Sequence, residues 1–114
     1  MEARLPAHIE VSGLIRSVEA AGGFATVIAR GERDAGTLLV ICCANGSPAK
    51  AYERMPLPDG TRAWTLTRTQ APETPQEFWD YCDRRKQQDG DLWIVELDIA
   101  DGERFIALAG SARC

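Results

Sequence analysis

The sequence predicts an α+β domain, in which two main helices and a short C-terminal helix pack on a largely antiparallel sheet of about five strands. Three observations lead to this class. Apolar residues recur at helical spacing in two segments, and β-rich segments bounded by glycine and proline turns lie between and after them. The chain has 114 residues, the length of one domain. We therefore expect residues 1–114 to form a single globular domain with the order α-β-β-β-β-α-β-α.

The first helix is predicted over His8 to Ala21. Its apolar positions recur at helical spacing, and polar residues occupy the opposite side. Gly22-Gly23 then ends the helix, because glycine accepts the left-handed conformation found at helix C-termini. The apolar stripe consists of Val11, Leu14, Ile15 and Val18, and the polar side consists of Glu10, Arg16, Ser17 and Glu19.

Four β-rich segments follow, and we expect them to form an antiparallel meander. The glycine-rich loop Gly31–Gly36 is predicted to join two paired strands, and Asn45-Gly46 is typical of a hairpin turn. The second segment is apolar at both parities, which indicates a central strand. Pro56 and Pro58 cannot donate ladder hydrogen bonds, so they predict a sheet edge. The four strands are expected over Phe24–Arg30, Thr37–Ala44, Lys50–Leu57 and Arg62–Thr69.

The last third of the chain contains the second helix and the fifth strand. Thr74-Pro75-Gln76-Glu77 matches a capping box, and the helix that it starts is expected to run to about Gln88. The strand Asp91–Ile99 alternates between two faces. One face holds Trp93, Val95, Leu97 and Ile99, and the other holds Leu92, Ile94, Glu96 and Asp98. Asp101-Gly102 turns the chain into a short helix over Glu103–Ala109.

Composition excludes several classes of protein. The chain carries 13 basic and 17 acidic side chains, a formal net charge of −4. Its longest apolar run, Leu38 to Ala44, is far shorter than the ~20 residues of a membrane span. The acidic balance disfavours nucleic-acid binding, with a local patch of Arg54, Arg62 and Arg68 left open. The start of the chain holds no apolar secretory segment, so we expect a cytoplasmic protein that inserts into no membrane.

Two groups of side chains are candidates for binding a ligand. Glu96 and Asp98 lie two positions apart on one strand face, where two carboxylates can hold a cation or divide acid and base roles. Arg30 and Arg33 flank or lie within the glycine-rich loop, where backbone amides beside guanidinium groups can hold an anion. The alternatives are a solvated strand end and an ordinary hairpin loop, and both are favoured over a site.

The cysteines and the aromatic helix suggest two further possibilities. Adjacent Cys42 and Cys43 point to opposite faces of a strand and make neither a mutual disulfide nor a shared metal site. With His8 as the only histidine, no local pattern marks a nucleophile, and the sequence predicts no metal site and no cofactor. Trp79 and Tyr81 diverge from the apolar stripe of the second helix, so one of them is a candidate interface residue, against the alternative of a broad core stripe.

Two stretches carry a resemblance to a known family. One comprises Arg4–His8 with the helix that follows, Gly22–Val27 and the Asp34-Ala35-Gly36 turn, and the other is Asp89–Asp98. Together they resemble the small bacterial family of unknown function DUF1491 over nearly the whole chain. The resemblance implies a single cytoplasmic domain and no assigned activity.

The sequence therefore favours a non-catalytic protein-interaction module, either a homodimer or a partner of another cytoplasmic protein. The alternative is a small-molecule or anion-binding protein, or an enzyme, that uses Arg30, Arg33 and the carboxylates Glu96 and Asp98.

Overall fold

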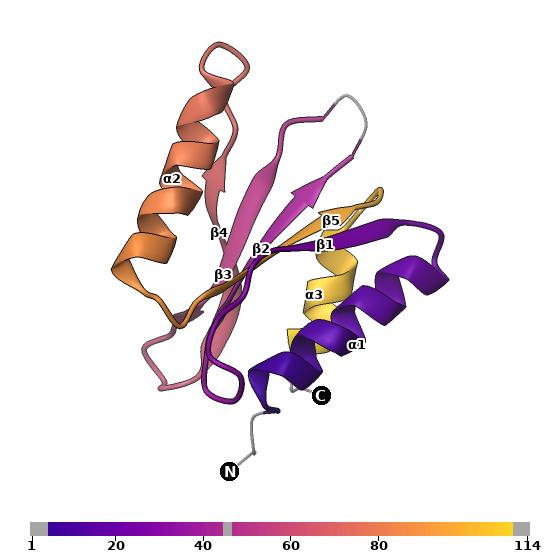
Figure 1. Ribbon diagram of the computed structural model, residues 1–114, viewed down its shortest axis with the longest axis vertical. Coiled ribbons are helices and arrows are strands. Elements are labelled where there is room, and N and C mark those ends of the chain that lie inside the picture. The colour runs from indigo at the N-terminus through magenta and orange to yellow at the C-terminus, as the bar shows by residue number, and fades with distance from the viewer. Residues whose placement is uncertain (1–4, 45–46, 111–114) are drawn as a thin grey trace.

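The computed structural model describes residues 5–44 and 47–110, which fold into three helices and five strands (Figure 1). The class and the order of elements match the sequence prediction. The helices are α1 (Ala7–Ala20), α2 (Pro75–Gln88) and α3 (Glu103–Gly110). The strands are β1 (Phe24–Ala29), β2 (Leu38–Cys43), β3 (Lys50–Pro56), β4 (Arg62–Thr69) and β5 (Trp93–Asp98). The predicted Asn45-Gly46 turn lies outside the described residues.

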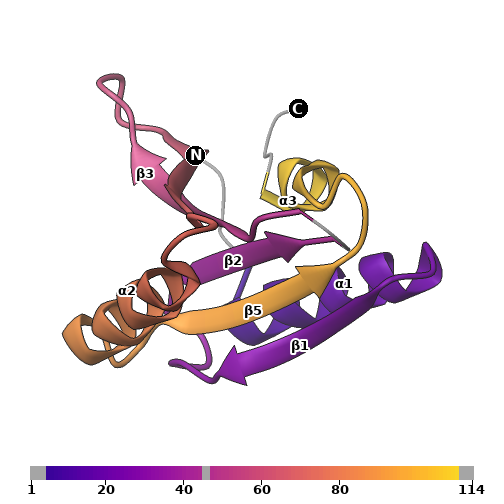
Figure 2. The same ribbon diagram turned by 90° about the horizontal axis from the view of Figure 1, so that it is seen from above.

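The five strands form one mixed sheet in the order β1-β5-β2-β3-β4. Strand β5 runs parallel to β2, and the other three pairings are antiparallel. The predicted meander is therefore wrong at its first step, because β5 lies between β1 and β2 (Figure 2). The physical reason is burial. Leu92 to Val95 are buried on both sides, and only a central position covers both faces of a strand.

The glycine-rich loop wraps around the start of β5 instead of closing a hairpin. Trp93 donates its backbone N–H to the Thr37 carbonyl at 2.8 Å and its indole N–H to the Glu32 carbonyl at 2.8 Å. The backbone N–H of Glu32 donates to the Asp91 carbonyl at 3.0 Å. A Cβ atom at Gly31 would overlap that same carbonyl, so glycine is required here for the close approach of two backbones.

The starts of α2 and α1 are stabilised in different ways, and the capping box predicted for α2 does not form. Helix α2 begins at Pro75 as expected, but the Thr74 hydroxyl lies 3.3 Å from the Glu77 carboxylate and makes no side-chain cap to the backbone. Helix α1 is capped by the glycine-rich loop. The backbone N–H groups of Ala7 and His8 donate to loop carbonyls at 3.0 and 2.9 Å.

The edges of the sheet are β1 and β4. The edge predicted near Pro56 exists only at the end of β3. Strand β2 pairs with β3 from Lys50 to Glu53, and beyond Glu53 only β4 pairs with β3.

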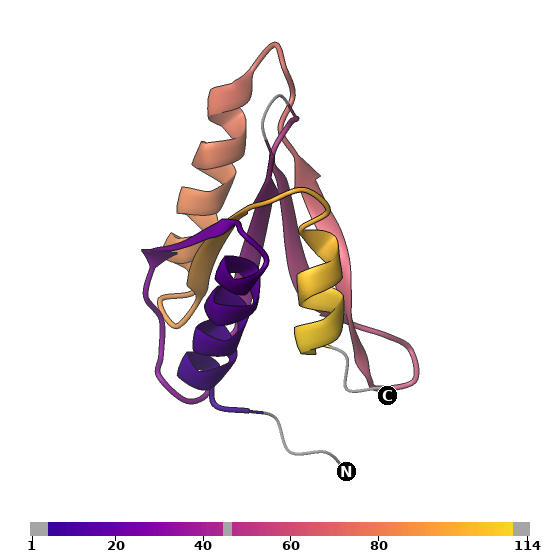
Figure 3. The same ribbon diagram turned by 90° about the vertical axis from the view of Figure 1, so that its right-hand side faces the viewer.

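Helices cover both faces of the sheet. Helices α1 and α3 lie side by side on one face, and α2 packs on the other (Figures 1 and 3). The side chains of β5 alternate between these two cores as predicted, with Trp93, Val95 and Leu97 in the first and Leu92 and Ile94 in the second. Within the described residues, none of the helices combines the length and the apolarity needed to cross a bilayer.

Alanine substitutions at two glycines test two different effects on stability. One removes a close contact between backbones, and the other changes only helix propensity. We expect Gly31→Ala to lower the free energy of unfolding by about 1–3 kcal/mol, because its Cβ overlaps the Asp91 carbonyl. Gly13→Ala, in α1, meets no atom within 4 Å and should raise it by about 0.5–1 kcal/mol. Urea denaturation of both variants measures the difference. Equal stability of the two would contradict the wrapped loop.

Candidate functional site

Backbone amides of the glycine-rich loop bind a carboxylate of the same loop, that of Glu32. The Glu32 carboxylate accepts the backbone N–H groups of Ala35 and Asp34, the latter at 2.9 Å. These two hydrogen bonds, led by that of Ala35, lower the pKa of Glu32 below its ordinary value. The loop is thus organised around its own carboxylate and around the start of α1.

The four predicted ligand residues lie in two separate places. The Arg30 guanidinium stacks over the Trp93 ring at 5.3 Å, at the start of β5, and the exposed Arg33 side chain lies 4.0 Å from Asp34. Glu96 and Asp98 share the α2-side face at the opposite end of β5. The two carboxylates therefore share one strand face, and the structure places both arginines away from them. Across residues 5–44 and 47–110, no group of three or more metal-ligating side chains gathers.

Cys42 and Cys43 are poor nucleophiles. Cys42 points into the α1–α3 core and Cys43 toward the α2 face, as predicted for adjacent strand residues. Burial raises the pKa of each thiol to about 12, and for Cys43 the hydrogen bond that its Sγ donates to Glu96 at 3.2 Å adds to the effect. His8 lies elsewhere, with Nδ1 3.1 Å from the Arg33 carbonyl oxygen.

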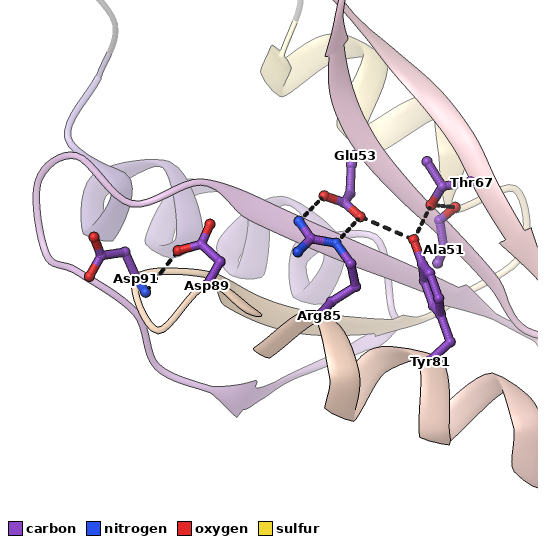
Figure 4. A network of polar contacts seen from close by, with 7 residues as sticks. All are labelled: Ala51, Glu53, Thr67, Tyr81, Arg85, Asp89 and Asp91. Carbon is purple, nitrogen blue, oxygen red and sulfur yellow. Dashed lines mark hydrogen bonds and ion pairs between the residues drawn. The ribbon is translucent and has the colours of Figure 1, made fainter. Parts of the chain in front are cut away.

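The two predicted interface residues belong to the packing of α2. The Tyr81 hydroxyl lies 3.3 Å from the Glu53 carboxylate and 3.2 Å from the Thr67 hydroxyl, so it points toward the sheet (Figure 4). The half-buried Trp79 ring packs edge-on against Phe78 at 5.1 Å. The large apolar side chains that are exposed in the described part of the chain lie outside α2.

Three consecutive residues of β3 each hold a different helix. The Tyr52 hydroxyl donates to Glu103 of α3 at 2.8 Å, and burial together with this hydrogen bond raises the pKa of Tyr52. On the other face, Glu53 accepts two hydrogen bonds from Arg85 of α2, at 2.7 and 3.1 Å (Figure 4).

The third of these contacts joins β3 to α1. Arg54 donates to both carboxylate oxygens of Glu10, at 2.6 and 2.9 Å. The prediction that Glu10 lies on the solvent side of its helix is wrong, because only 6% of its surface is exposed. A neighbouring arginine compensates a buried carboxylate, and helical periodicity cannot reveal a partner 44 residues away.

A groove of about 260 Å³ opens between α1 and α3, beside this ion pair. Leu14 and Phe105 are buried at the groove, whereas Leu5 and Ile9 are 54% and 45% exposed. We call it the α1–α3 groove; its lining residues are Leu5, Ile9, Glu10, Gly13, Leu14, Ser17 and Phe105. The sequence signal was present in Leu5 and Ile9, which lie outside the predicted apolar stripe.

Three interacting side chains, Glu10, Arg54 and Trp64, support one wall of the groove. Glu10 lines the groove, Arg54 binds Glu10, and the Arg54 guanidinium stacks over the Trp64 ring at 4.9 Å. In the described part of the chain the buried indole N–H of Trp64 has no hydrogen-bond partner. This arrangement fixes the wall of the groove through charge and stacking rather than through apolar packing alone.

Comparisons with known proteins agree with this fold. The chain matches the family model described as "Protein of unknown function (DUF1491)" over residues 5–107. It is similar to the crystal structure of a DUF1491 family protein from Caulobacter crescentus CB15, with 32% identity, a TM-score of 0.76, and coverage of 90% of this chain and 94% of that chain. Against the NMR structure of a DUF1491 family protein from the same organism the identity is 31%, the TM-score 0.76 and the coverage 91% and 94%.

A third solved structure, that of protein Atu0922 from A. tumefaciens, is 28% identical with a TM-score of 0.68, covering 87% of this chain and 89% of that chain. Among curated proteins, none matches the chain.

The Glu10–Arg54 ion pair predicts a non-additive pair of substitutions. We expect Arg54→Met to lower the free energy of unfolding by about 3–5 kcal/mol, because it leaves a buried carboxylate unpaired. Glu10→Leu combined with Arg54→Met should recover most of the loss, because no buried charge remains. Urea denaturation of both variants measures this, and a double variant as unstable as the single one would contradict it.

The raised thiol pKa values predict slow alkylation. At pH 8.5 we expect Cys42 and Cys43, with pKa values of about 12, to react with iodoacetamide roughly a thousandfold more slowly in the folded chain than in urea. Cys82, with a pKa raised to about 11, should react sooner. Mass spectrometry of a Cys114→Ser variant follows each site, and rapid labelling of folded Cys43 would show that its thiol is accessible and ionised.

Proposed function

The chain belongs to the DUF1491 family of proteins of unknown function, and on the geometry of the α1–α3 groove we propose that it is a non-catalytic protein-interaction module. The groove receives apolar side chains from a helical segment of a cytoplasmic partner protein. The observation that carries this proposal is the exposure of Leu5 and Ile9 beside an open groove with an apolar floor.

The size of the groove favours side chains over a whole small molecule. Its volume of about 260 Å³ is below the ~300–1,000 Å³ of typical small-molecule sites. It exceeds the ~150 Å³ of a cavity that binds benzene. One or two apolar side chains of a partner therefore fit the space.

The shape of α1 favours a helical partner. Ile9, Gly13 and Ser17 are spaced four residues apart, so they form a row of about 12 Å along one side of the helix. Gly13 in the middle of the row carries no side chain, and a Cβ atom there would meet nothing within 4 Å. A partner helix can approach the backbone closely at this point and place apolar residues on either side, as helix-in-groove complexes do.

The polar side chains that could take part in a reaction are already paired or kept protonated, which supports a non-catalytic role. Glu53 and Glu10 are held by arginines, and the Cys42 and Cys43 thiols have pKa values of about 12. The alternative, an anion site at Arg30 and Arg33, is less favoured because Glu32 already accepts the amides of that loop.

Filling the groove tests the proposal. Gly13→Leu places a side chain in the open space of the groove, whereas Ser12→Leu adds the same side chain at the neighbouring exposed position outside it. Proteins captured from source lysate by the wild type are compared with those captured by both variants. A candidate is then purified, and its affinity is measured by calorimetry.

We expect Gly13→Leu to weaken binding of the purified partner at least tenfold, about 1.4 kcal/mol, and Ser12→Leu to leave it unchanged. Both variants should remain folded, because leucine is a better helix former than glycine or serine. A partner that binds the wild type and Gly13→Leu equally well would place the interaction surface elsewhere and overturn the assignment of the groove.

A further inference from the structure

Two exposed arginines border the α1–α3 groove, one on each of the helices that lie side by side in Figure 3. Arg104 belongs to the first turn of α3, and its guanidinium lies over the Phe105 ring, 4.4 Å from the ring centroid. Because Phe105 lines the groove, this stacking holds a positive charge at the α3 wall. On the other helix, Arg16 follows Gly13 by three residues and Ile9 by seven. This spacing places Arg16 on the same side of α1 as these two lining residues.

Neither of these arginines is neutralised within the described part of the chain. No described carboxylate forms an ion pair with Arg16 or Arg104. The carboxylate of Glu10 in the groove wall is already paired with Arg54, and that of Glu103 accepts a hydrogen bond from β3. The exposed, unpaired charges at the groove border are therefore positive, in a chain whose formal net charge is −4. A local potential opposite in sign to the net charge selects partners by their charge.

The same wall of the groove contains an arginine that is stacked on a ring and also binds a carboxylate. The Arg54 guanidinium lies over the Trp64 ring at 4.9 Å, and its N–H groups donate to both Glu10 oxygens at 2.6 and 2.9 Å. Arg104 is stacked on Phe105 in the same manner, and no hydrogen bond within the described chain uses its guanidinium N–H groups. Stacking holds the guanidinium in place, so less side-chain freedom is lost when a carboxylate binds its N–H groups.

We propose that the partner helix in the α1–α3 groove is acidic, with carboxylates on both borders of its apolar row. This inference rests on the proposed function of the groove and names the chemistry of its occupant. When the apolar row lies over Ile9 and Gly13, a carboxylate on each side of it forms an ion pair with Arg104 or Arg16. A basic helix with the same apolar row is repelled, so the charges supply specificity. Nucleic acid carries negative charge but no apolar side chains for the groove floor, so an acidic helix is the better match.

Two synthetic peptides test the charge of the partner. Each is an alanine-rich helix of about 16 residues with leucine at i, i+4 and i+7, and it carries either glutamate or lysine on both borders of the leucine row. Glutamate and lysine are similar helix formers, so the two peptides differ in charge alone. In about 0.1 M salt we expect the glutamate peptide to bind the wild type about tenfold more tightly than the lysine peptide, as measured by calorimetry. The difference should shrink in about 1 M salt, where the Debye length falls to about 3 Å.

Charge reversal at the groove border locates the effect. Arg104→Glu should lower the preference for the glutamate peptide at least threefold, because it replaces an attraction by a repulsion. Arg84→Glu makes the same change of charge at an exposed position of α2, on the other face of the sheet, and should leave the preference unchanged. A glutamate in the first turn of α3 suits the helix dipole, so the Arg104→Glu variant should remain folded.

The outcomes separate this inference from the proposal for the groove itself. Equal binding of both peptides to the wild type, weakened for both by Gly13→Leu, would overturn the acidic partner and leave the groove as a helix-binding site. A preference for the glutamate peptide that survives Arg104→Glu would overturn the role of Arg104. Binding of neither peptide to the wild type, or binding that Gly13→Leu does not weaken, would contradict both the acidic partner and the groove.

Discussion

The arrangement of this protein depends on three consecutive residues of β3 that fasten three helices. Tyr52 and Arg54 point to one face and bind α3 and α1, while Glu53 points to the other and binds α2. A slip of the strand by one residue would turn all three side chains to the wrong faces, leaving buried charges without partners. The ion pairs therefore fix the register of β3 and the identity of the helix on each face more than they add to stability. They also hold the wall of the α1–α3 groove.

Insertion of β5 between β1 and β2 ties the two halves of the chain together. The loop after β1 must pass around the start of β5, and its carbonyls then cap α1. Lys86 of α2 secures the same region, because its Nζ donates to the carbonyls of Arg30, Gly90 and Leu92 at 2.7–2.9 Å. The glycines, the acid and the arginines of the loop thus serve the topology. The composition of this loop resembles that of an anion site, but in this protein the loop connects the start of β5 to the N-terminus of α1.

Several ionisable side chains are paired or shielded by burial, while several large apolar side chains remain exposed. The carboxylates of Glu10 and Glu53 form ion pairs with arginines. Burial keeps the Cys42 and Cys43 thiols protonated. The large apolar residues left at the surface include Leu5 and Ile9 at the groove and Phe24 and Ile28 on the edge strand β1. Such a surface supports the interaction module proposed above, since burying apolar area drives binding without a reaction.

The sequence by itself determined the class, the element order, the two faces of β5 and the family resemblance, because periodicity and turn residues are local signals. Only the tertiary structure decided that β5 separates β1 from β2, that Glu10 is buried and that Tyr81 faces the sheet. Each of these depends on a partner far along the chain, such as Arg54 for Glu10 and Glu53 for Tyr81. The groove likewise exists only because α3 returns beside α1, and no local pattern encodes the distance between two helices.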